Sequence, residues 1–438
     1  MVEAAAKNGH IAILQWAKDN GHDLTATGPN KEICSFAART GQFETLKWLH
    51  SNGAHIGIHT CKMATEGGHL EIIKWLRQND CPWHELIASI AAKEGHLDIL
   101  KWIHDSKLPL SSYATAAAAS GGHIDVLKWF VSIGITIDSW ACNSAAQGGH
   151  LETLQWLMAQ GLQMDSANLA ATGGNLELLQ WLVSKGCALT SSCYTSAASR
   201  GHLHIVKWLI QNNCAWDSTA SAAATSHLEV LKWLRENECP WDALTCSEAI
   251  RGGHFESLKW AINNGCNYTA SRDDFVACAS TGNLEMLQYL KDLGFPITAD
   301  APYAAASSGH LRTLKWLYEN KCPWSPKGIC AYAAASGNLD MIKWLREKLQ
   351  SEWDETTCRS AAEQGHLHIL KYAREIGCPW KEDTCYYAAS KGHLETLKWA
   401  RANGCPWDAD TTALAEAGGH TETLKWAIEN GCPTRKRF

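Results

Sequence analysis

A short pattern centred on a Gly-His pair, or a close variant of it, recurs along the whole chain and constrains the fold more than any other feature. Taking the glycine of each pair as an anchor gives fifteen glycines, and Ser226 takes the place of glycine once, so the chain contains sixteen repeats. Most anchors are 27 residues apart. A chain of 438 residues would ordinarily form two or three domains, but this internal period predicts an array of stacked repeats instead. The anchor glycines are Gly9, Gly41, Gly68, Gly95, Gly122, Gly149, Gly174, Gly201, Gly253, Gly282, Gly309, Gly337, Gly365, Gly392 and Gly419.

The residues after each anchor predict a short, largely buried helix. We number positions from the anchor, with negative numbers toward the N-terminus. After Gly68, apolar residues stand at +2, +5, +7 and +8 (Leu70, Ile73, Trp75 and Leu76), which is one helical stripe plus a flank. A second glycine at +12 in ten repeats is the cap expected at the end of this helix.

The residues before each anchor predict another short helix that packs closely on its neighbours. An alanine pair stands at −4 and −3, for example Ala145 with Ala146, and side chains this small let neighbouring backbones approach. Glycine at the anchor permits the positive φ of a tight turn. Each repeat is therefore expected to be a helix-turn-helix unit, and the whole chain, residues 1–438, a single all-α solenoid.

The repeat carries a family resemblance. The run AASKGHLETLKWARANG, from Ala388 to Gly404, closely resembles the ankyrin repeat, and the resemblance covers essentially the whole chain. The period is about six residues short of the usual ~33, and Thr384 and Cys385 replace the usual Thr-Pro-Leu-His opening. The resemblance implies short Cys-Pro-Trp-Asp turns, as at Cys239 to Asp242, in place of β-hairpin fingers. Short repeats of this kind resemble those of giant DNA viruses and some protists.

Tryptophan is unusually frequent, with 22 Trp against 7 Phe and 10 Tyr, and it falls into two rows. The first row stands at +7 in fourteen repeats, from Trp16 to Trp426. We interpret it as a ladder of rings buried between successive second helices, with an exposed binding stripe as the alternative. The second row lies in the turns, where either packing or contact with a partner is expected. Its members are Trp83, Trp216, Trp241, Trp324, Trp380 and Trp407.

The eighteen cysteines follow the repeat as well, nine at +13 and seven at −7. We interpret them as small buried hydrophobic side chains. No Cys-x-x-Cys occurs, and pairs such as Cys239 with Cys246 lack the usual zinc spacing, so we expect no metal and no cofactor. A long chain without an export signal is not a disulfide scaffold, which predicts a reducing, cytoplasmic location, the host cytoplasm if the protein is viral.

The histidines give no indication of an active site. Twelve of the twenty follow an anchor, where the resemblance implies a side chain that hydrogen-bonds the turn backbone. The others have no neighbouring Cys–Asp or Ser–Asp grouping, and the sequence contains no phosphate-binding Gly-rich loop. We therefore predict that the protein is not an enzyme.

Charge and hydropathy exclude two classes of partner. The net charge is −6 and the Lys and Arg residues are scattered, so the basic footprint needed for nucleic acid is missing. No run of eighteen apolar residues predicts a membrane span. An acidic residue at +3 and Lys at +6, such as Glu71 and Lys74, predict a solvated face on the second helix.

Protein binding is the function that these features predict. The positions just before the anchor vary between repeats, and the resemblance implies that they line a concave binding face. We predict that a monomeric scaffold binds a protein partner there and along the turn edge. The candidate residues are Arg39, Thr40, Lys93, Glu94, Arg251, Glu363, Gln364 and Lys391, with Trp83, Trp241, Trp324, Trp380 and Trp407 in the turns.

Several expectations concern irregular parts of the array. The chain begins inside a first helix at Val2 and ends in a short basic tail, 434–438, which leaves open a truncated first repeat and end-to-end stacking. A structural spacer is therefore one alternative function, and a metal or redox protein, resting on the Cys count, is another. The insert at 22–31 predicts a lone finger or a loop, and the altered spacing around Ser226 predicts a local irregularity near 213–227.

Overall fold

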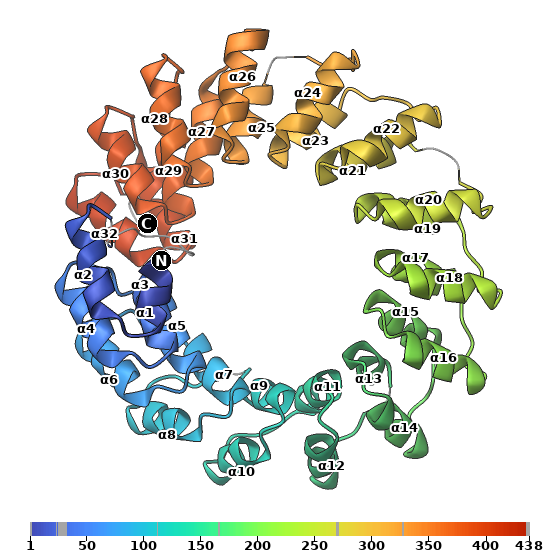
Figure 1. The fold of residues 1–438 in the computed structure, drawn as a ribbon. Helices are drawn as coiled ribbons and strands as arrows, with labels where there is room; N and C mark the ends of the chain where they lie inside the picture. Colours follow the sequence, from blue (N-terminus) through green and yellow to red (C-terminus); the bar gives the residue numbers. More distant parts are fainter. Residues whose placement is uncertain are drawn as a thin grey trace. The chain divides into compact units, whose positions relative to one another are not determined.

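The computed structural model describes residues 2–22, 24, 33–111, 113–164, 167–268, 271–325 and 328–434. These residues form 32 α-helices and one short 3-10 helix, and they contain no β-strand, so the predicted all-helical solenoid of helix-turn-helix repeats is confirmed (Figure 1). Short turns join the helices where fingers would otherwise stand. The insert, apart from His22 and Leu24, and the tail beyond Thr434 lie outside the described residues.

The chain divides into two compact units, Met1–Ala220 and Ser221–Phe438. The first helices of the first unit are α1 (Val2–Lys7), α3 (Ile33–Arg39), α5 (Ile58–Glu66), α7 (Leu86–Lys93), α9 (Ala114–Gly121), α11 (Ser139–Gly148), α13 (Asn168–Gly173) and α15 (Ser191–Ser199). Its second helices are α2 (Ile11–Asp19), α4 (Phe43–Ser51), α6 (Leu70–Gln78), α8 (Leu97–Asp105), α10 (Ile124–Ser132), α12 (Leu151–Ala159), α14 (Leu176–Ser184) and α16 (Leu203–Gln211).

The division falls within α17 (Ser218–Ala223), which is followed by the 3-10 helix η1 (Ala224–Ser226). In the second unit the first helices are α19 (Ala243–Arg251), α21 (Arg272–Thr281), α23 (Ala301–Ser307), α25 (Ile329–Ala335), α27 (Glu355–Glu363), α29 (Glu382–Ser390) and α31 (Ala409–Ala417). The second helices are α18 (Leu228–Glu236), α20 (Phe255–Asn263), α22 (Leu284–Asp292), α24 (Leu311–Glu319), α26 (Leu339–Leu349), α28 (Leu367–Glu375), α30 (Leu394–Ala402) and α32 (Thr421–Glu429).

Each unit has two rows of helices, the first helices on its concave side and the second helices on its convex side (Figure 1). The core lies between the rows. The alanine pairs at −4 and −3, such as Ala388 and Ala389, are completely buried where consecutive first helices meet. The second helices contribute the leucines and isoleucines at +5 and +8, such as Ile73 and Leu76. Both sequence interpretations of the core are confirmed.

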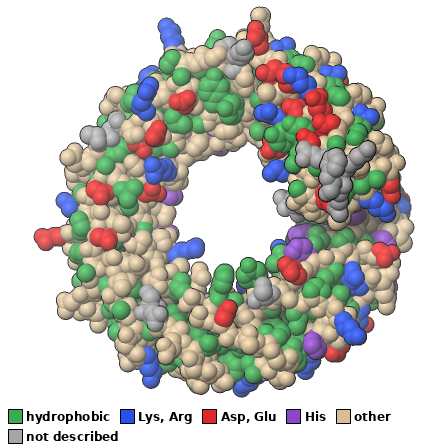
Figure 2. Space-filling view, turned by 180° about the vertical axis from the view of Figure 1, so that it is seen from behind, with side chains coloured by type: hydrophobic (Ala, Val, Ile, Leu, Met, Phe, Trp, Pro, Cys, Tyr) green, Lys and Arg blue, Asp and Glu red, His purple; other side chains and the backbone are tan. Residues whose placement is uncertain are grey.

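The expected surface pairs are present on the second helices. The Lys74 ammonium lies 2.7 Å from the Glu71 carboxylate. Lys232 and Glu229, which have the same separation in sequence, form an equivalent ion pair. Such exposed pairs contribute only a few tenths of a kcal/mol each. On the face that Figure 2 shows, Lys and Arg side chains are scattered among acidic ones.

The predicted irregularity around Ser226 is confirmed. The first helix of that repeat ends at Ala223 and continues as one 3-10 turn, in which Ser226 does not adopt the left-handed conformation. All fifteen anchor glycines have positive φ, for example +75° at Gly68. Serine avoids this conformation, and the chain closes the turn differently where glycine is missing.

The turn after the second helix uses positive φ even where the sequence lacks glycine. The glycines at +12 have this conformation, and in five repeats another residue adopts it: Asp80, Lys107, Asn213, Glu238 and Lys321. The left-handed conformation costs an L-residue roughly 1–2 kcal/mol. The same turn therefore forms in these repeats as well, and the non-glycine residue adopts a strained backbone conformation.

Replacing Lys321, which has φ of +55°, tests this strain. We expect Lys321→Gly to raise the free energy of unfolding by about 0.5–1 kcal/mol, because relief of the left-handed strain exceeds the entropy that glycine loses on folding. Urea denaturation of the full chain measures the difference. Lys321→Ala is the control, since it removes the same side chain and keeps the strain. Equal stability of the two variants would contradict the explanation.

In many repeats the histidine after the anchor links the repeat to its neighbour. The His69 ring nitrogen Nε2 lies 3.1 Å from the carbonyl oxygen of Arg39, and His150 Nε2 lies 2.9 Å from that of Ser120. Because a carbonyl oxygen accepts, Nε2–H donates in each case. The predicted hydrogen bond to turn backbone is thus present, but its acceptor belongs to the preceding repeat. Where asparagine replaces histidine, the link persists, as from Asn338 Nδ2 to the Gly309 carbonyl at 2.9 Å.

The same ring explains why the anchor must be glycine. A Cβ placed on Gly68 would lie 2.6 Å from Cε1 of His96, the histidine of the next repeat. The anchor therefore provides the left-handed turn and leaves room for the neighbouring imidazole. The sequence indicated only the first of these two requirements.

Burial of these imidazoles predicts that stability depends on pH. Burial lowers the pKa of His366 and His393 below the usual value near 6.5, although the hydrogen bonds to the carbonyls of Ala335 and Glu363 oppose the shift. A pKa that is lower in the folded state means that the folded state favours the neutral ring. The stabilisation is complete above about pH 6.5 and is lost as the pH falls below that value.

We therefore expect the urea concentration at the unfolding midpoint to decrease when the pH is lowered from 7.5 to 5.0. The decrease should be smaller in the double variant His366→Asn, His393→Asn. Asparagine retains the inter-repeat bond, as Asn338 does, and cannot be protonated. The measurement is urea denaturation of both proteins at a series of pH values. Identical curves for the two proteins would show that these rings do not carry the effect.

The tryptophans at +7 pack against the preceding second helix but are only partly buried. Trp75 meets His50 edge-on with ring centroids 5.5 Å apart, and Trp344 meets Tyr318 at 5.9 Å. Trp16, in α2, is 51% exposed. The interpretation as an inter-repeat ladder agrees with these contacts, and apart from Trp16 the +7 tryptophans are half-buried.

Candidate protein-binding surface

Most first helices present a stripe of exposed or half-buried side chains at positions −9, −6, −5 and −2. In α7 these positions hold Leu86, Ser89, Ile90 and Lys93, and the residues between them, such as Ala91, are buried. The spacing of three and four residues places the four side chains on one face of the helix. Because the first helices stand side by side in each unit, their stripes form a continuous surface on the concave side. We call this surface the first-helix face.

One part of the first-helix face is hollow and apolar. A cavity of about 350 Å³ opens where α5, α7 and α9 adjoin. Two lysines and two histidines stand among its aliphatic residues, and no carboxylate lines it. The lining residues are Ile58, His59, Lys62, His84, Leu86, Ile87, Ser89, Ile90, Lys93 and Ala117.

Large apolar side chains extend from the cavity across the neighbouring helices. Ile58 is 42% exposed, Leu86 51%, Tyr113 54% and Trp140 57%, and the rings of Tyr113 and Trp140 meet edge-on at 5.7 Å. These residues lie near the N-terminal ends of α5, α7, α9 and α11. We call these four residues the apolar strip. Exposed apolar residues in one continuous patch are typical of interaction sites.

The turn tryptophans take part in contacts within the protein. The Arg235 guanidinium carbon lies 4.5 Å from the Trp241 ring centroid, and Trp241 meets Trp260 of the next second helix at 5.7 Å. The same arrangement recurs at Trp83, Trp380 and Trp407, each with an arginine at +9 of the preceding helix. These arginines also donate to the backbone carbonyls of Cys81, Cys378 and Cys405. The geometry favours the packing interpretation of these four tryptophans.

Trp324 differs because Tyr318 stands where the others have arginine. With Tyr318 and Leu349 it lines a separate cavity of about 380 Å³. Trp324 therefore borders an open space. Its role in binding stays a prediction.

Comparison with known proteins identifies the repeats. Residues 167–245 match the family model described as ankyrin repeats (3 copies), and residues 330–374 match ankyrin repeats (many copies). The chain is an ankyrin-repeat protein. No curated protein sequence matches it.

Two solved structures of repeat proteins are similar to the chain at a low level. The human ASB11 ankyrin repeat domain is 17% identical over 37% of this chain and 84% of that chain, with a TM-score of 0.32. The maize pentatricopeptide repeat protein PPR10 is 13% identical over 99% of this chain and 84% of that chain, with a TM-score of 0.28. Similarity at this level carries no argument about function. The resemblance to repeats of giant viruses and protists stays a prediction.

The candidate residues before the anchors lie at the C-terminal ends of first helices, at one edge of the first-helix face. Seven are exposed and Glu363 is half-buried. They are spread over the ankyrin repeats of both units and do not converge on one site. The seven are Arg39, Thr40, Lys93, Glu94, Arg251, Gln364 and Lys391. Lys93 alone among the eight lines the cavity under the apolar strip.

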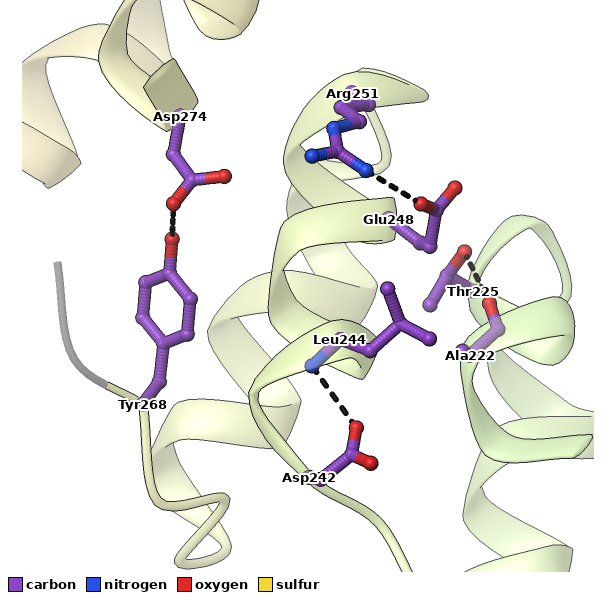
Figure 3. A network of polar contacts seen from close by, with 8 residues as sticks. All are labelled: Ala222, Thr225, Asp242, Leu244, Glu248, Arg251, Tyr268 and Asp274. Carbon is purple, nitrogen blue, oxygen red and sulfur yellow. Dashed lines mark hydrogen bonds and ion pairs between the residues drawn. The ribbon is translucent and has the colours of Figure 1, made fainter. Parts of the chain in front are cut away.

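Some of these side chains already have partners in the ankyrin-repeat protein. Arg39 Nε lies 3.8 Å from the Glu66 carboxylate, and the Thr40 hydroxyl donates to the Lys7 carbonyl oxygen at 2.8 Å. Arg251 pairs with Glu248 at 2.9 Å (Figure 3). These contacts are exposed, and they leave the side chains accessible to a partner.

The polar network drawn in Figure 3 has a structural role. Asp242 accepts a hydrogen bond from the Leu244 amide at 2.9 Å and so caps α19. The Tyr268 hydroxyl donates to the buried carboxylate of Asp274. Burial, together with this carboxylate, raises the pKa of Tyr268, so the phenol remains a neutral donor. The network therefore fixes the ends of α19 and α21.

The cysteines have the buried character that the sequence predicted. Seventeen of the eighteen are buried, and Cys214 is partly exposed. Burial raises the pKa of Cys330 to about 12 and that of Cys322 to about 11, which disfavours the thiolate that metal binding and nucleophilic attack require. The Cys246 thiol is hydrogen-bonded to Cys266, which raises the pKa of Cys246.

The described residues also bear on two alternatives, a metal site and a membrane-spanning helix. They contain no cluster of three or more His, Cys, Asp or Glu side chains able to hold a metal ion. Among them, no helix has the length and apolar character needed to cross a membrane.

Positions −9, −6 and −5 of the first-helix face were missed by the sequence analysis, which named only −2 and −1. A signal for them exists. Counting back from a variable residue at −2 in steps of three and four reaches −5, −6 and −9, the rest of the same helical face. In α7 that count leads from Lys93 to Ile90, Ser89 and Leu86.

Proposed function

We propose that this ankyrin-repeat protein binds a partner protein through the first-helix face. One observation carries the proposal: position −9 changes chemical character from repeat to repeat while the core positions stay the same. It is Leu86, Tyr113 and Trp140 in three consecutive repeats of the first unit. In the second unit it is aspartate in four repeats: Asp273, Asp300, Asp383 and Asp410. Since the same helix forms with either kind of residue, packing within the protein does not determine this position.

Repeat solenoids present such surfaces to partners, and ankyrin repeats generally mediate protein–protein interaction. The proposal assigns no catalytic activity and no cofactor to the chain. Scattered lysines and arginines favour a protein over nucleic acid as the partner. Free thiols throughout the described residues fit a reducing compartment, and the cytoplasm is the proposed location.

Affinity capture from the native cell tests the proposal. The bait is the full chain, beside a variant with three charge changes on the first-helix face and at its C-terminal edge: Lys93→Glu on the face, and Gln364→Glu and Lys391→Glu at the edge. We expect the wild type to retain a defined protein that this variant releases. These side chains are exposed, so the variant should remain folded, which circular dichroism checks.

The matched control carries the same three kinds of substitution on the second helices: Lys101→Glu, Gln155→Glu and Lys371→Glu. These residues are also exposed and stand at position +6. If the control loses the partner as readily as the first variant does, the binding surface is not the first-helix face. Concentration-dependent elongation of the purified chain, without capture of another protein, would favour a self-stacking spacer instead.

A further inference from the structure

The apolar strip and its cavity are the most distinctive feature of the first-helix face. Three of the four strip residues, Leu86, Tyr113 and Trp140, occupy position −9 of consecutive repeats, and Ile58 precedes that position by one. The equivalent position holds aspartate in other repeats, at Asp300 and Asp410, so the fold of the repeat does not require an apolar side chain there. The exposure of the strip residues therefore has a cause outside the protein's own packing.

The cavity beneath the strip is suited to one large apolar side chain. Its walls are mainly Ile58, Leu86, Ile87 and Ile90, and Ala117 leaves space on the α9 side. A volume of about 350 Å³ lies at the lower end of the range for ligand sites. An apolar side chain that enters such a site leaves water, which is the main source of affinity at the centre of an interface.

The charges around the cavity favour an anionic ligand. Lys62 and Lys93 stand on the α5 and α7 walls, with His59 and His84 beside them. Among the described residues, no carboxylate lines the cavity. Both lysines are exposed, and within that part of the chain neither forms an ion pair; Glu66, on the same helix as Lys62, pairs with Arg39 instead. Carboxylates beside the inserted side chain would complement these ammonium groups.

The extent of the strip favours a peptide over a small molecule. From α5 to α11 the strip crosses three steps between stacked helices, each about 8–10 Å, or about 24–30 Å in total. An extended chain covers this distance with about eight or nine residues. A single small molecule in the cavity would leave Tyr113 and Trp140 uncovered.

From these observations we propose that the apolar strip binds a short acidic peptide segment of a partner protein, whose bulky aliphatic or aromatic side chain enters the cavity between α5, α7 and α9. The carboxylates of the segment pair with Lys62 and Lys93, and its apolar residues cover Tyr113 and Trp140. This inference rests on the proposed function and specifies the partner's chemistry at one part of the first-helix face.

A displayed library of random twelve-residue peptides, selected on the full-length chain, tests the proposal. We expect the enriched peptides to combine a Trp, Phe or Leu with at least two acidic residues. Synthetic copies should bind more weakly as NaCl is raised, because salt screens the exposed lysines. Enrichment of basic or uncharged peptides, or of none, overturns the proposal.

Three variants locate the binding. Leu86→Asp should weaken the selected peptides by about 30-fold or more, because it places a charge in the apolar wall and repels their carboxylates. The double variant Lys62→Gln, Lys93→Gln should weaken them by about 10-fold and abolish the salt dependence, because it removes both positive charges. Leu244→Asp is the matched control: Leu244 occupies the same −9 position, is 41% exposed and lies in the other unit. It should leave binding unchanged.

Two results separate failure of this inference from failure of the proposed function. A captured partner protein that the triple first-helix-face variant loses, but Leu86→Asp retains, supports the proposed function and overturns the docking site. Native mass spectrometry of the purified chain gives the second result. A bound small apolar acid that Leu86→Asp loses would show that the cavity serves a small molecule, which also overturns the peptide proposal.

Discussion

Gly392→Ala is expected to lower the free energy of opening of the last repeats by about 3 kcal/mol. Left-handed φ, +73° at this residue, costs alanine about 1–2 kcal/mol. The new Cβ would also lie 2.6 Å from Nδ1 of His420, so the imidazole must move. Its hydrogen bond to the Ser390 carbonyl oxygen, 3.0 Å long, would be strained or lost, which costs about another 1 kcal/mol. Hydrogen exchange of the amides in α29 to α32 measures the change locally.

Gly419→Ala provides a close control within the same unit. Gly419 is also an anchor, its φ is +72°, and none of the described residues would lie within 4 Å of a Cβ placed there. This variant should show the backbone strain alone, about 1–2 kcal/mol. If both variants cost the same, the imidazole of the next repeat does not contribute to the requirement for glycine.

Ala389→Leu is expected to lower the free energy of unfolding by about 2–3 kcal/mol. Ala389 is completely buried at position −3 of α29, which packs on α31 and α27. Protein interiors hold almost no free space, so three additional carbon atoms must force the helices apart or adopt a poor rotamer. The chain itself places alanine here in most repeats, which indicates that the distance between first helices is set by this small side chain.

Ala402→Leu controls for the added hydrophobic surface, because Ala402 is exposed at the end of α30. Urea denaturation should distinguish the two variants clearly. Because stacked repeats unfold locally, hydrogen exchange near α29 supplies an independent reading. Stability of Ala389→Leu equal to that of the wild type would mean that the first helices tolerate wider spacing than the alanine pairs suggest.

The architecture was predictable because one short pattern is repeated sixteen times. A single repeat would give an ambiguous helical stripe, whereas sixteen copies separate the constant positions, such as Ile73 and Leu76, from the variable ones. Local rules then suffice: glycine for the turn, alanine for close packing and leucine for the core. The irregular turn at Ser226 was predictable for the same reason, since one departure stands out against fifteen conforming turns.

Contacts between repeats were predicted less well. The direction of the His69 side chain, toward Arg39 of the preceding repeat, depends on how two helix pairs stack, which a linear pattern does not specify. The partial burial of Trp75 and the stacking of Arg235 on Trp241 depend on the same geometry. The position of the binding surface was predicted poorly for the same reason. In the sequence Leu86 resembles a core leucine, and only the stacking of the helices shows that its side chain is exposed.

The histidine links give the array a polarity. Where this link forms, the histidine completes the turn of the repeat before it, so one repeat can donate such a bond through His69 and offer the Glu66 carbonyl to the next. When one whole repeat is gained or lost, one donor and one acceptor are gained or lost together, so the remaining links stay intact. A deletion or insertion that ends inside a repeat separates the donor from the acceptor. Duplication in units of one full period is thus the change of length that this fold accommodates most easily, and it enlarges the first-helix face without disturbing the surface already present.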